Sequence, residues 1–311
     1  MKPTVGRVLA IDVGGTGSRA RLDNTEVTGP GVRIGAEGIP LGAILDTLVS
    51  GLPAGPIDTV SVGMSGLLGL TAPDAALGEL RQRWPWARIV LASDAVTAAA
   101  AALGAEGGIA IAVGTGVVGL ATNFRDVWRR VDGWGHLLGD EGGGAWIGAR
   151  GLRAALREHD GRAGGSAALL HEATEIFGQP EGLPWLLYTR ADRAGILASF
   201  VPAVARAAAA GDQVARAIGT DAAHAVADTA AALLTAPVPH TLAFTGGLLH
   251  SRELFAFPLI ERLTDRLPHV DVTLAEAKPL DGAELLARAA GLPKGGRPPF
   301  LTIDVPHGNH S

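Results

Sequence analysis

Two strand–turn–strand patterns, about 100 residues apart, constrain the fold of this 311-residue chain more than any other feature. In the first, the apolar run 7–13 leads into a glycine turn and the chain returns through Ser18–Leu22. In the second, the run 108–113 leads into a Gly-Thr-Gly turn and returns through 118–122. Apolar runs joined by glycine turns are typical of β-hairpins. The repetition therefore predicts two domains of related topology.

Strand-like and helical segments alternate along the rest of the chain, which predicts an α/β fold with mixed sheets. Further strands are expected at 59–64, 88–92 and 242–245. Helices are expected at 41–50, 74–83, 95–103, 146–158, 165–176, 192–210, 213–235 and 281–290. We place an N-terminal domain at 1–105, a C-terminal domain at 106–292 and a loosely ordered tail at 293–311.

Composition narrows the class of function. The net charge is -5 and Lys and Arg do not cluster, which argues against nucleic-acid binding as the main task. No apolar run reaches the roughly 20 residues that span a bilayer, and the N-terminal segment meets glycines too early for a signal peptide. We expect a cytoplasmic protein that acts on small molecules, without a membrane partner.

The chain contains no cysteine. Disulfides, thiolate zinc sites, cysteine nucleophiles and cysteine-held iron–sulfur clusters are therefore all excluded.

The first glycine turn has the composition of a phosphate-binding turn. Glycines let a backbone approach phosphate oxygens, hydroxyl groups add donors, and an acidic residue at a strand end can hold magnesium through water. Asp12 is the candidate metal ligand. The candidate phosphate-binding residues are Gly14, Gly15, Thr16, Gly17 and Ser18. A tight hairpin with a polar end is the structural alternative.

Two later turns repeat this chemistry. Gly114, Thr115 and Gly116 occupy the same place in the second hairpin, and Gly246 and Gly247 follow a buried strand. A pair of such hairpins could hold a triphosphate from both sides, so the pair is more specific than either turn. Taken alone, Gly246-Gly247 is more often a plain strand-to-helix turn.

The complete set of motifs resembles the BadF/BadG/N-acetylglucosamine kinase family, which belongs to the actin/hexokinase/Hsp70 superfamily. The similarity runs from about residue 7 to 290. It rests on Asp12–Arg19, Ser93-Asp94-Ala95, Gly114–Gly116, the segment GWGHLLGDEG at 133–142 and Thr245-Gly246-Gly247. The resemblance implies two actin-like (ribonuclease H-like) domains with an ATP cleft between them, Mg²⁺ with the nucleotide, and a sugar at the base of the cleft.

Asp94 has the central role in this interpretation. It follows a strand and opens a helix, so local sequence alone favours a helix cap. The resemblance implies instead that Asp94 contacts the sugar hydroxyl that attacks ATP and acts as general base. One positioned carboxylate with a magnesium-bound triphosphate is a sufficient set for phosphoryl transfer.

The resemblance also implies the remaining ligand contacts. Gly133, Trp134, Gly135 and Asp140 match the sugar-binding segment of the family, and Ser199 falls where some members place a residue near the nucleotide. The role of Glu141 stays open between a magnesium contact and a cap, and His136 is more often structural than catalytic at such a site.

One position departs from the family pattern. Glu37 stands where members tend to place an asparagine on the sugar, and a carboxylate there accepts protons but does not donate them. If Glu37 faces the sugar, a sugar that carries its own carboxylate is expected to be a poor substrate.

The predicted activity is ATP-dependent phosphorylation of an amino sugar, with N-acetylglucosamine converted to its 6-phosphate. Glucosamine kinase and a non-enzymatic, ATP-switched actin-like module are the alternatives. The branch of the family that activates radical dehydratases holds an iron–sulfur cluster with cysteines, which this chain lacks. A homodimer is the expectation at the level of the family.

Overall fold

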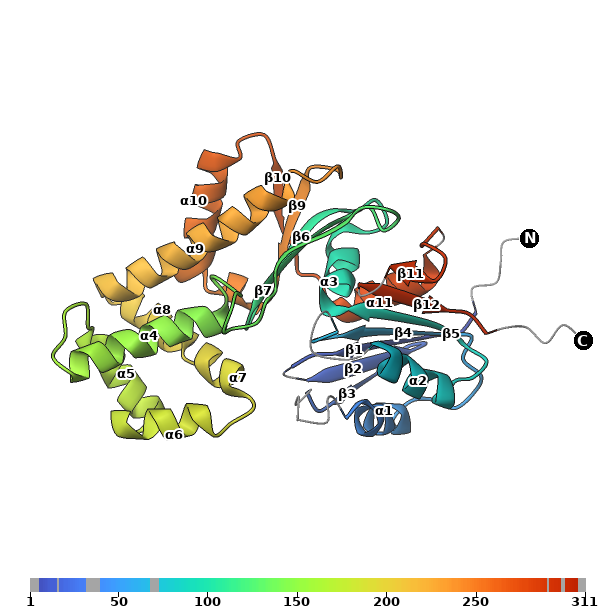
Figure 1. The fold of residues 1–311 in the computed structure, drawn as a ribbon, viewed down its shortest axis with the longest axis horizontal. Helices are drawn as coiled ribbons and strands as arrows, with labels where there is room; N and C mark the ends of the chain where they lie inside the picture. Colours follow the sequence, from blue (N-terminus) through green and yellow to red (C-terminus); the bar gives the residue numbers. More distant parts are fainter. Residues whose placement is uncertain are drawn as a thin grey trace, which may run out of the picture. The chain divides into compact units, whose positions relative to one another are not determined.

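The computed structural model describes residues 6–15, 17–31, 40–67, 73–289, 291–297 and 300–306. These residues form two compact units (Figure 1). Unit 1 comprises the described residues within 1–110, 122–128 and 276–311, and unit 2 comprises 111–121 and 129–275.

Unit 1 is built on a seven-stranded sheet with the order β11-β12-β5-β4-β1-β2-β3. Its strands are β1 (Val8–Val13), β2 (Ser18–Leu22), β3 (Thr25–Gly29), β4 (Thr59–Met64), β5 (Arg88–Ser93), β11 (Gly296–Arg297) and β12 (Leu301–Asp304). β1 and β2 form the antiparallel hairpin that the sequence predicts, while β1, β4 and β5 run parallel. The helices are α1 (Leu41–Ser50), α2 (Pro73–Arg83), α3 (Asp94–Leu103) and α11 (Pro279–Arg288).

Side-chain alternation along β1 determines what covers each face of this sheet. Leu9 and Ile11 belong to the main core with α1 and α2, whereas Ala10 packs against Leu280 and Ala283 of α11 (Figure 1). The small alanine side chains let α11 lie close to the sheet. Asp12 lies on the same face as Ala10, two residues further along the strand.

The segment after Ala275 returns to unit 1, although the division drawn from sequence assigned it to the C-terminal domain and a loose tail. The guanidinium of Arg21 on β2 donates to Asp281 at 2.7 Å and to Glu284 at 3.2 Å, both on α11. β12 pairs antiparallel with β5, and Leu301 is fully buried. Both contacts join residues more than 190 positions apart, which local patterns do not reveal.

Unit 2 contains most of a five-stranded sheet with the order β10-β9-β6-β7-β8. The strands are β6 (Gly108–Val113), β7 (Val117–Thr122), β8 (Trp128–Asp132), β9 (Thr241–Thr245) and β10 (Asp271–Leu274). The helices are α4 (Gly144–His159), α5 (Ala167–Phe177), α6 (Leu183–Tyr188), α7 (Arg193–Ala198), α8 (Val201–Ala209), α9 (Gln213–Leu233) and α10 (Phe257–Arg266). α4 packs against α5, α7, α8 and α9.

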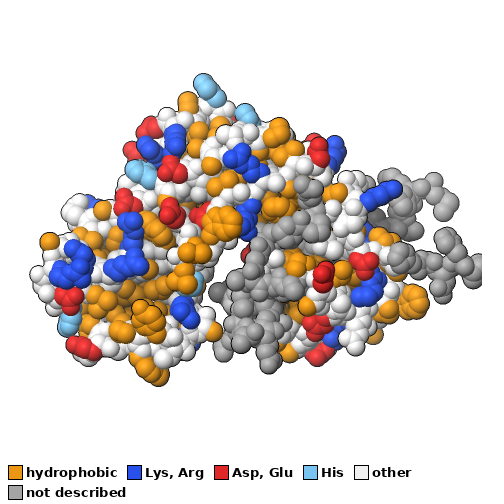
Figure 2. Space-filling view, in the orientation of Figure 1, with side chains coloured by type: hydrophobic (Ala, Val, Ile, Leu, Met, Phe, Trp, Pro, Cys, Tyr) orange, Lys and Arg blue, Asp and Glu red, His pale blue; other side chains and the backbone are white. Residues whose placement is uncertain are grey.

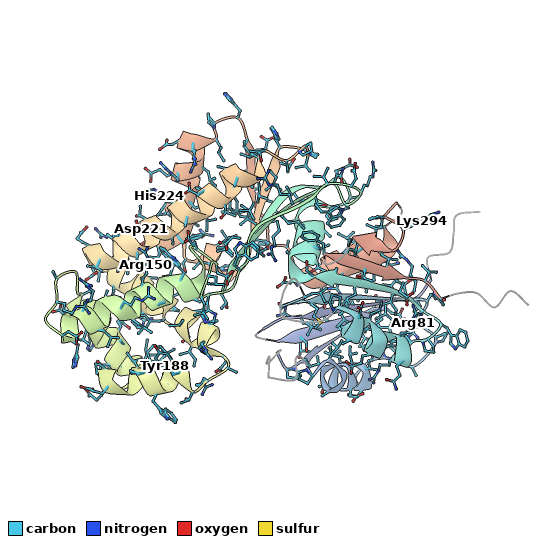
Figure 3. All side chains as sticks on the ribbon, viewed as in Figure 1. Arg81, Arg150, Tyr188, Asp221, His224 and Lys294 are labelled. Carbon is cyan, nitrogen blue, oxygen red and sulfur yellow. The ribbon has the colours of Figure 1, made fainter. Side chains whose placement is uncertain are left out.

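Polar contacts on the surface add to this helical packing. An ion pair of 2.9 Å between Arg150 and Asp221 joins α4 to α9 (Figure 3). Figure 2 shows hydrophobic side chains gathered over α5 and α6, where Ile176, Trp185 and Tyr188 are exposed. In the described part of the chain, no helix combines the length and apolar character needed to cross a bilayer.

All the expected strands are confirmed, and so are the expected helices apart from one. The single helix predicted at 192–210 is wrong, because α7 ends at Ala198 and α8 begins at Val201. Pro202 explains the break, since its ring clashes with the carbonyl four residues earlier and it has no N–H to donate. The sequence analysis did not anticipate β3, β8, β10, β11, β12, α6 and α10.

Candidate active site

In unit 1, three parallel strands end side by side. Val13 of β1 is level with Met64 of β4, and Met64 is level with Ser93 of β5. The residues that follow these strands therefore meet at one edge of the sheet, where α/β folds commonly bind ligands. The N–H of Ser65 donates to the carbonyl of Val13 at 2.9 Å, which fixes the end of β4 to the end of β1.

Asp94 lies at this edge as the first residue of α3. Its Oδ1 accepts a hydrogen bond of 2.8 Å from the N–H of Ala95, and its Oδ2 accepts one of 2.8 Å from the hydroxyl of Ser65. Burial raises the pKa of Asp94, while these two hydrogen bonds act in the opposite direction. The residue before it, Ser93, makes no side-chain cap. Ser93 is thus the N-cap by position, whereas the local sequence favoured Asp94; Asp94 is the first helical residue and its side chain bonds to an N–H of the first turn.

Asp12 is the second carboxylate of this edge, and only 8% of its surface is exposed. Burial raises its pKa to about 6, with a further increase from the negative charge of Asp94. Arg19, which is level with Asp12 on the neighbouring strand β2, partly opposes the increase.

The Asp12 carboxylate fits a magnesium ion. Mg²⁺ prefers carboxylate and phosphate oxygens and is commonly held by one or two carboxylates together with substrate phosphates, not by a cage of protein ligands. Within the described ranges no group of three or more His, Asp or Glu side chains forms such a cage. A divalent cation would also relieve the unfavourable charge of the buried Asp12 carboxylate beside Asp94.

The first glycine turn closes through a hydrogen bond of 3.0 Å from the N–H of Gly14 to the carbonyl of Gly17. Ser18, by contrast, is 1% exposed and packs against Gly29 of β3. Its hydroxyl has no hydrogen-bond partner among the residues that the structure describes. Two of the predicted site residues, Thr16 and Glu37, lie outside the described residues.

In unit 2, the second glycine turn is joined to the start of α4. The carbonyl of Gly114 accepts from the N–H of Gly144 at 2.8 Å, and the carbonyl of Thr115 accepts from the N–H of Ala145 at 2.8 Å. The carboxylate of Asp140 lies directly against Gly116, where a Cβ atom would come within 2.4 Å of Oδ2. A side chain at position 116 would displace the Asp140 carboxylate, so the turn and the carboxylate form one compact arrangement.

Asp132, at the end of β8, holds the segment 133–141 in place, and the sequence analysis missed it. Its Oδ1 accepts from the N–H of Asp140 at 2.8 Å, and its Oδ2 accepts from the N–H of Glu141 at 3.0 Å. Asp140 has a φ of +56°, which costs energy for a residue with a Cβ and persists only where neighbours fix the backbone. In the sequence, a carboxylate residue directly before a glycine-rich segment could have indicated this role.

The segment held in this way contains the predicted sugar-binding residues. Gly133 and Gly135 have φ values of +76° and +84°, which glycine adopts without strain. Trp134 is 65% exposed, and the guanidinium of Arg130 lies 4.3 Å from its ring centre. His136 has a buried Nε2 with no described partner, and burial together with the charge of Arg193 lowers its pKa.

The remaining predicted nucleotide-binding residues lie close to the second turn. Gly246 follows β9 with a φ of +114°, and a Cβ there would come within 2.4 Å of the carbonyl oxygen of Val113. Ser199 follows Ala198, which packs against Gly144, and its hydroxyl donates to the carbonyl of Ile196 at 2.7 Å. Unit 2 therefore brings the 114–116 turn, Gly246 and Asp140 together.

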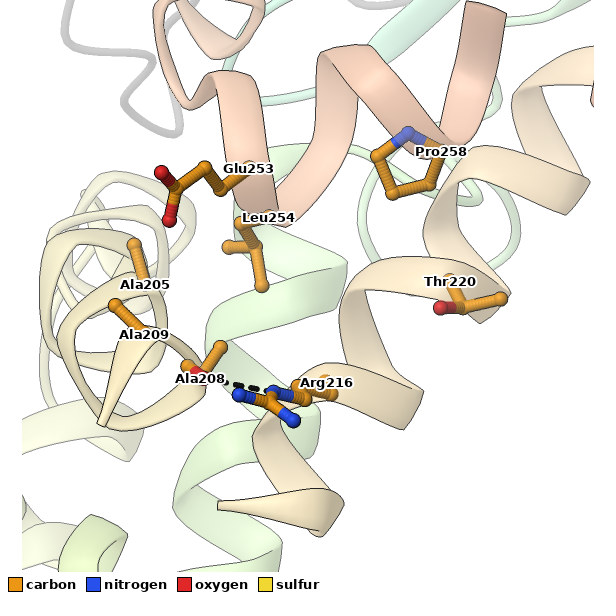
Figure 4. Close-up of a pocket in the computed structure, with 8 residues that line it drawn as sticks. All are labelled: Ala205, Ala208, Ala209, Arg216, Thr220, Glu253, Leu254 and Pro258. Carbon is orange, nitrogen blue, oxygen red and sulfur yellow. Dashed lines mark hydrogen bonds between the residues drawn. The ribbon is translucent and has the colours of Figure 1, made fainter. Parts of the chain in front are cut away.

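A separate pocket in unit 2 contains none of these residues. It is lined by alanines of α8 with Arg216, Thr220, Glu253, Leu254 and Pro258 (Figure 4). The Nε of Arg216 donates to the carbonyl of Ala208 at 2.9 Å. We do not include this pocket in the candidate site.

Comparison with known proteins decides the family. The family model described as BadF/BadG/BcrA/BcrD ATPase matches residues 9–287. The chain belongs to this ATPase family. The match covers β1 through nearly all of α11, and so includes both glycine turns, Asp94 and the segment 133–142.

Relatives of this chain include sugar kinases. It is 28% identical over 187 residues to an N-acetyl-D-glucosamine kinase of Dictyostelium discoideum, across 58% of this chain and 59% of that protein. It is 37% identical over 75 residues to an N-acetylmuramic acid/N-acetylglucosamine kinase of Clostridium acetobutylicum, across 24% of each chain. The chain thus spans well under two thirds of both curated relatives.

Solved structures confirm the predicted fold class. A proposed N-acetylglucosamine kinase from Chromobacterium violaceum is 26% identical, with a TM-score of 0.72 over 92% of this chain and 100% of that one. A ROK family glucokinase from Streptomyces griseus, solved with glucose and AMPPNP, is 20% identical, with a TM-score of 0.62 over 91% of this chain and 99% of that one. This member of the BadF/BadG/BcrA/BcrD family has the two-domain, actin-like α/β fold.

Proposed function

We propose that the protein is an ATP-dependent sugar kinase that phosphorylates N-acetylglucosamine on its 6-hydroxyl. The observation that carries the proposal is the Asp94 carboxylate, held by two hydrogen bonds at the edge of the unit 1 sheet beside Asp12 and the first glycine turn. The names of the relatives supply the substrate class.

Asp94 is the proposed general base. It accepts the proton of the sugar 6-hydroxyl as the hydroxyl oxygen attacks the γ-phosphorus of ATP, and the bond from that phosphorus to the β-γ bridging oxygen breaks to release ADP. A raised pKa suits this task, because a base with a pKa closer to neutrality takes a proton more readily than an ordinary carboxylate.

The other predicted residues bind and orient. Asp12 would hold Mg²⁺, which supplies charge neutralisation for the triphosphate when bound. Gly114–Gly116 and Gly246-Gly247 offer close backbone approach to the nucleotide, and Asp140 with the 133–135 segment offers acceptors and exposed backbone groups to the sugar. A cytoplasmic location and a homodimer complete the proposal.

The test compares Asp94→Asn with the parent in an assay that couples ADP formation to added N-acetylglucosamine. We expect kcat to fall by roughly 10² to 10⁴, because an amide of equal size keeps ground-state contacts but does not accept the proton. Asp74→Asn is the matched control, since Asp74 also lies in the first turn of a unit 1 helix but is exposed.

Two results would contradict the proposal. Retention of more than about a tenth of the parent kcat in Asp94→Asn leaves Asp94 as a helix cap alone. Slow ATP hydrolysis by the parent that is independent of every amino sugar tested favours a nucleotide-switched module over a kinase.

A further inference from the structure

The hydroxyl of Ser65 contacts the proposed base directly, and the sequence analysis gave it no role. Ser65 immediately follows β4, and Asp94 immediately follows β5, the neighbouring parallel strand. Because Met64 is level with Ser93, the next residue of each strand falls at the same height on the sheet edge. The two side chains meet there, with the Ser65 Oγ 2.8 Å from Asp94 Oδ2.

The backbone around this pair is fixed from both sides. The N–H of Ser65 donates to the carbonyl of Val13, and the hydroxyl of Thr97 donates to the carbonyl of Asp94 at 3.1 Å. Gly63 makes this possible, since a Cβ there would come within 2.7 Å of the Thr97 Cγ2. The first turn of α3 thus lies close to the end of β4. This places the Ser65 hydroxyl within hydrogen-bonding distance of Asp94.

The Asp94 carboxylate accepts hydrogen bonds from two different elements. Oδ1 accepts from the N–H of Ala95 in its own helix, which restrains one oxygen of the carboxylate. The hydroxyl of Ser65, which follows a different element, restrains the other oxygen, so the two bonds together favour one orientation. Hydrogen bonds to an ionised carboxylate are among the stronger ones in proteins.

We propose that Ser65 is a positioning residue for the reaction: its hydroxyl holds Asp94 Oδ2 so that the carboxylate stays in a single orientation from which it accepts the proton of the sugar hydroxyl. Ser65 acts through Asp94 and does not itself take part in proton transfer. This inference rests on the proposed function.

The first experiment measures kcat and KM for Ser65→Ala and Ser65→Thr. Ser65→Ala is expected to lower kcat on the order of 10- to 100-fold with little change in KM for ATP, because the lost hydrogen bond orients the base. Ser65→Thr keeps the hydroxyl and is expected to restore most of kcat. Ser50→Ala is the matched control, since it removes a serine hydrogen bond of 2.8 Å elsewhere in unit 1.

The second experiment combines Ser65→Ala with Asp94→Asn. If Ser65 acts only through Asp94, the double variant is no slower than Asp94→Asn. Losses that multiply, or a Ser65→Ala variant with the parent kcat, overturn the inference. Should Ser65→Ala unfold, Ser65→Cys replaces it, because a thiol has a similar shape and is a weaker donor.

A crystal structure of Ser65→Ala separates this inference from the proposed function. More than one orientation of the Asp94 carboxylate, against one in the parent, supports the orientation of Asp94 by Ser65, and this result does not depend on whether the parent phosphorylates a sugar. The parent orientation retained in Ser65→Ala overturns the role of Ser65, and it leaves the kinase activity of the parent to be decided by the coupled assay.

Discussion

Asp12 and Asp94 show how one buried edge of a sheet changes the properties of ordinary carboxyl groups. Both lose hydration, and the charge of Asp94 further disfavours ionisation of Asp12. Asp94 receives two hydrogen bonds that oppose the increase in its pKa, while the charge of Arg19 across the hairpin opposes the increase at Asp12. An edge that keeps such groups is less stable than an apolar one would be, which is common at functional sites.

The raised pKa of Asp12 predicts a pH dependence of stability. The pKa is about 6 in the folded chain against 3.8 for an unperturbed carboxyl, so between these values the folded state binds more protons than the unfolded state. The free energy of unfolding should therefore fall as pH rises from about 4 to 6, by up to roughly 3 kcal/mol, and stay level above that.

Asp12→Asn removes this contribution. In urea unfolding with EDTA present, the variant should match the parent near pH 4 and be more stable than the parent at pH 8. Subtracting one stability profile from the other cancels the contributions of the other carboxyl groups. Parallel profiles across this range would show that the pKa of Asp12 is not raised as the structure indicates.

Helix crossings in this fold depend on glycines whose absent side chains make room for a neighbouring backbone. A Cβ on Gly282 of α11 would come within 1.8 Å of the carbonyl oxygen of Thr97 in α3, and one on Gly148 of α4 would come equally close to the carbonyl oxygen of Leu197. These glycines disfavour the isolated helix, because glycine has poor helix propensity. Packing outweighs propensity at both crossings.

Gly282→Ala is therefore expected to lower the free energy of unfolding by about 1 to 3 kcal/mol or more, because α11 and α3 must move apart. Gly78→Ala in α2 is the matched control, since no atom lies within 4 Å of its Cβ position. There alanine should stabilise by roughly 0.5 to 1 kcal/mol. Chemical denaturation of the two variants measures the difference, and equal effects would mean that the crossing tolerates a side chain.

Catalysis as proposed requires residues from both units. Asp94 and Asp12 belong to unit 1, whereas Asp140 and the Gly114–Gly116 turn belong to unit 2. If one sugar and one nucleotide engage groups of both units, as the family resemblance implies, their binding would restrain the two units, and closure would protect the phosphoryl group from water.

We therefore expect the radius of gyration in solution scattering to fall when N-acetylglucosamine and a non-hydrolysable ATP analogue are both present. The analogue alone should give a smaller change, because it engages only part of the predicted site. An unchanged radius at saturating concentrations of both ligands would contradict closure.

Sequence alone determined the features that depend on short-range patterns. The hairpin of β1 and β2, the strands that precede each glycine turn and most helices follow from periodicity and turn chemistry, which act over a few residues. The same patterns placed Asp12, Asp94 and both glycine turns at strand ends. For the candidate residues, resemblance to a family supplied roles that spacing did not.

Only the tertiary structure decided which segments meet. The return of α11 and β12 to unit 1 depends on contacts such as Arg21 with Asp281, 260 positions apart. The hydrogen bond from Ser65 to Asp94 depends on the register of β4 against β5. The hydrogen bonds that Asp132 accepts from residues 140 and 141 form because the loop after β8 folds back onto the end of that strand. Long-range register is set by packing of the whole sheet, so no local pattern contains it.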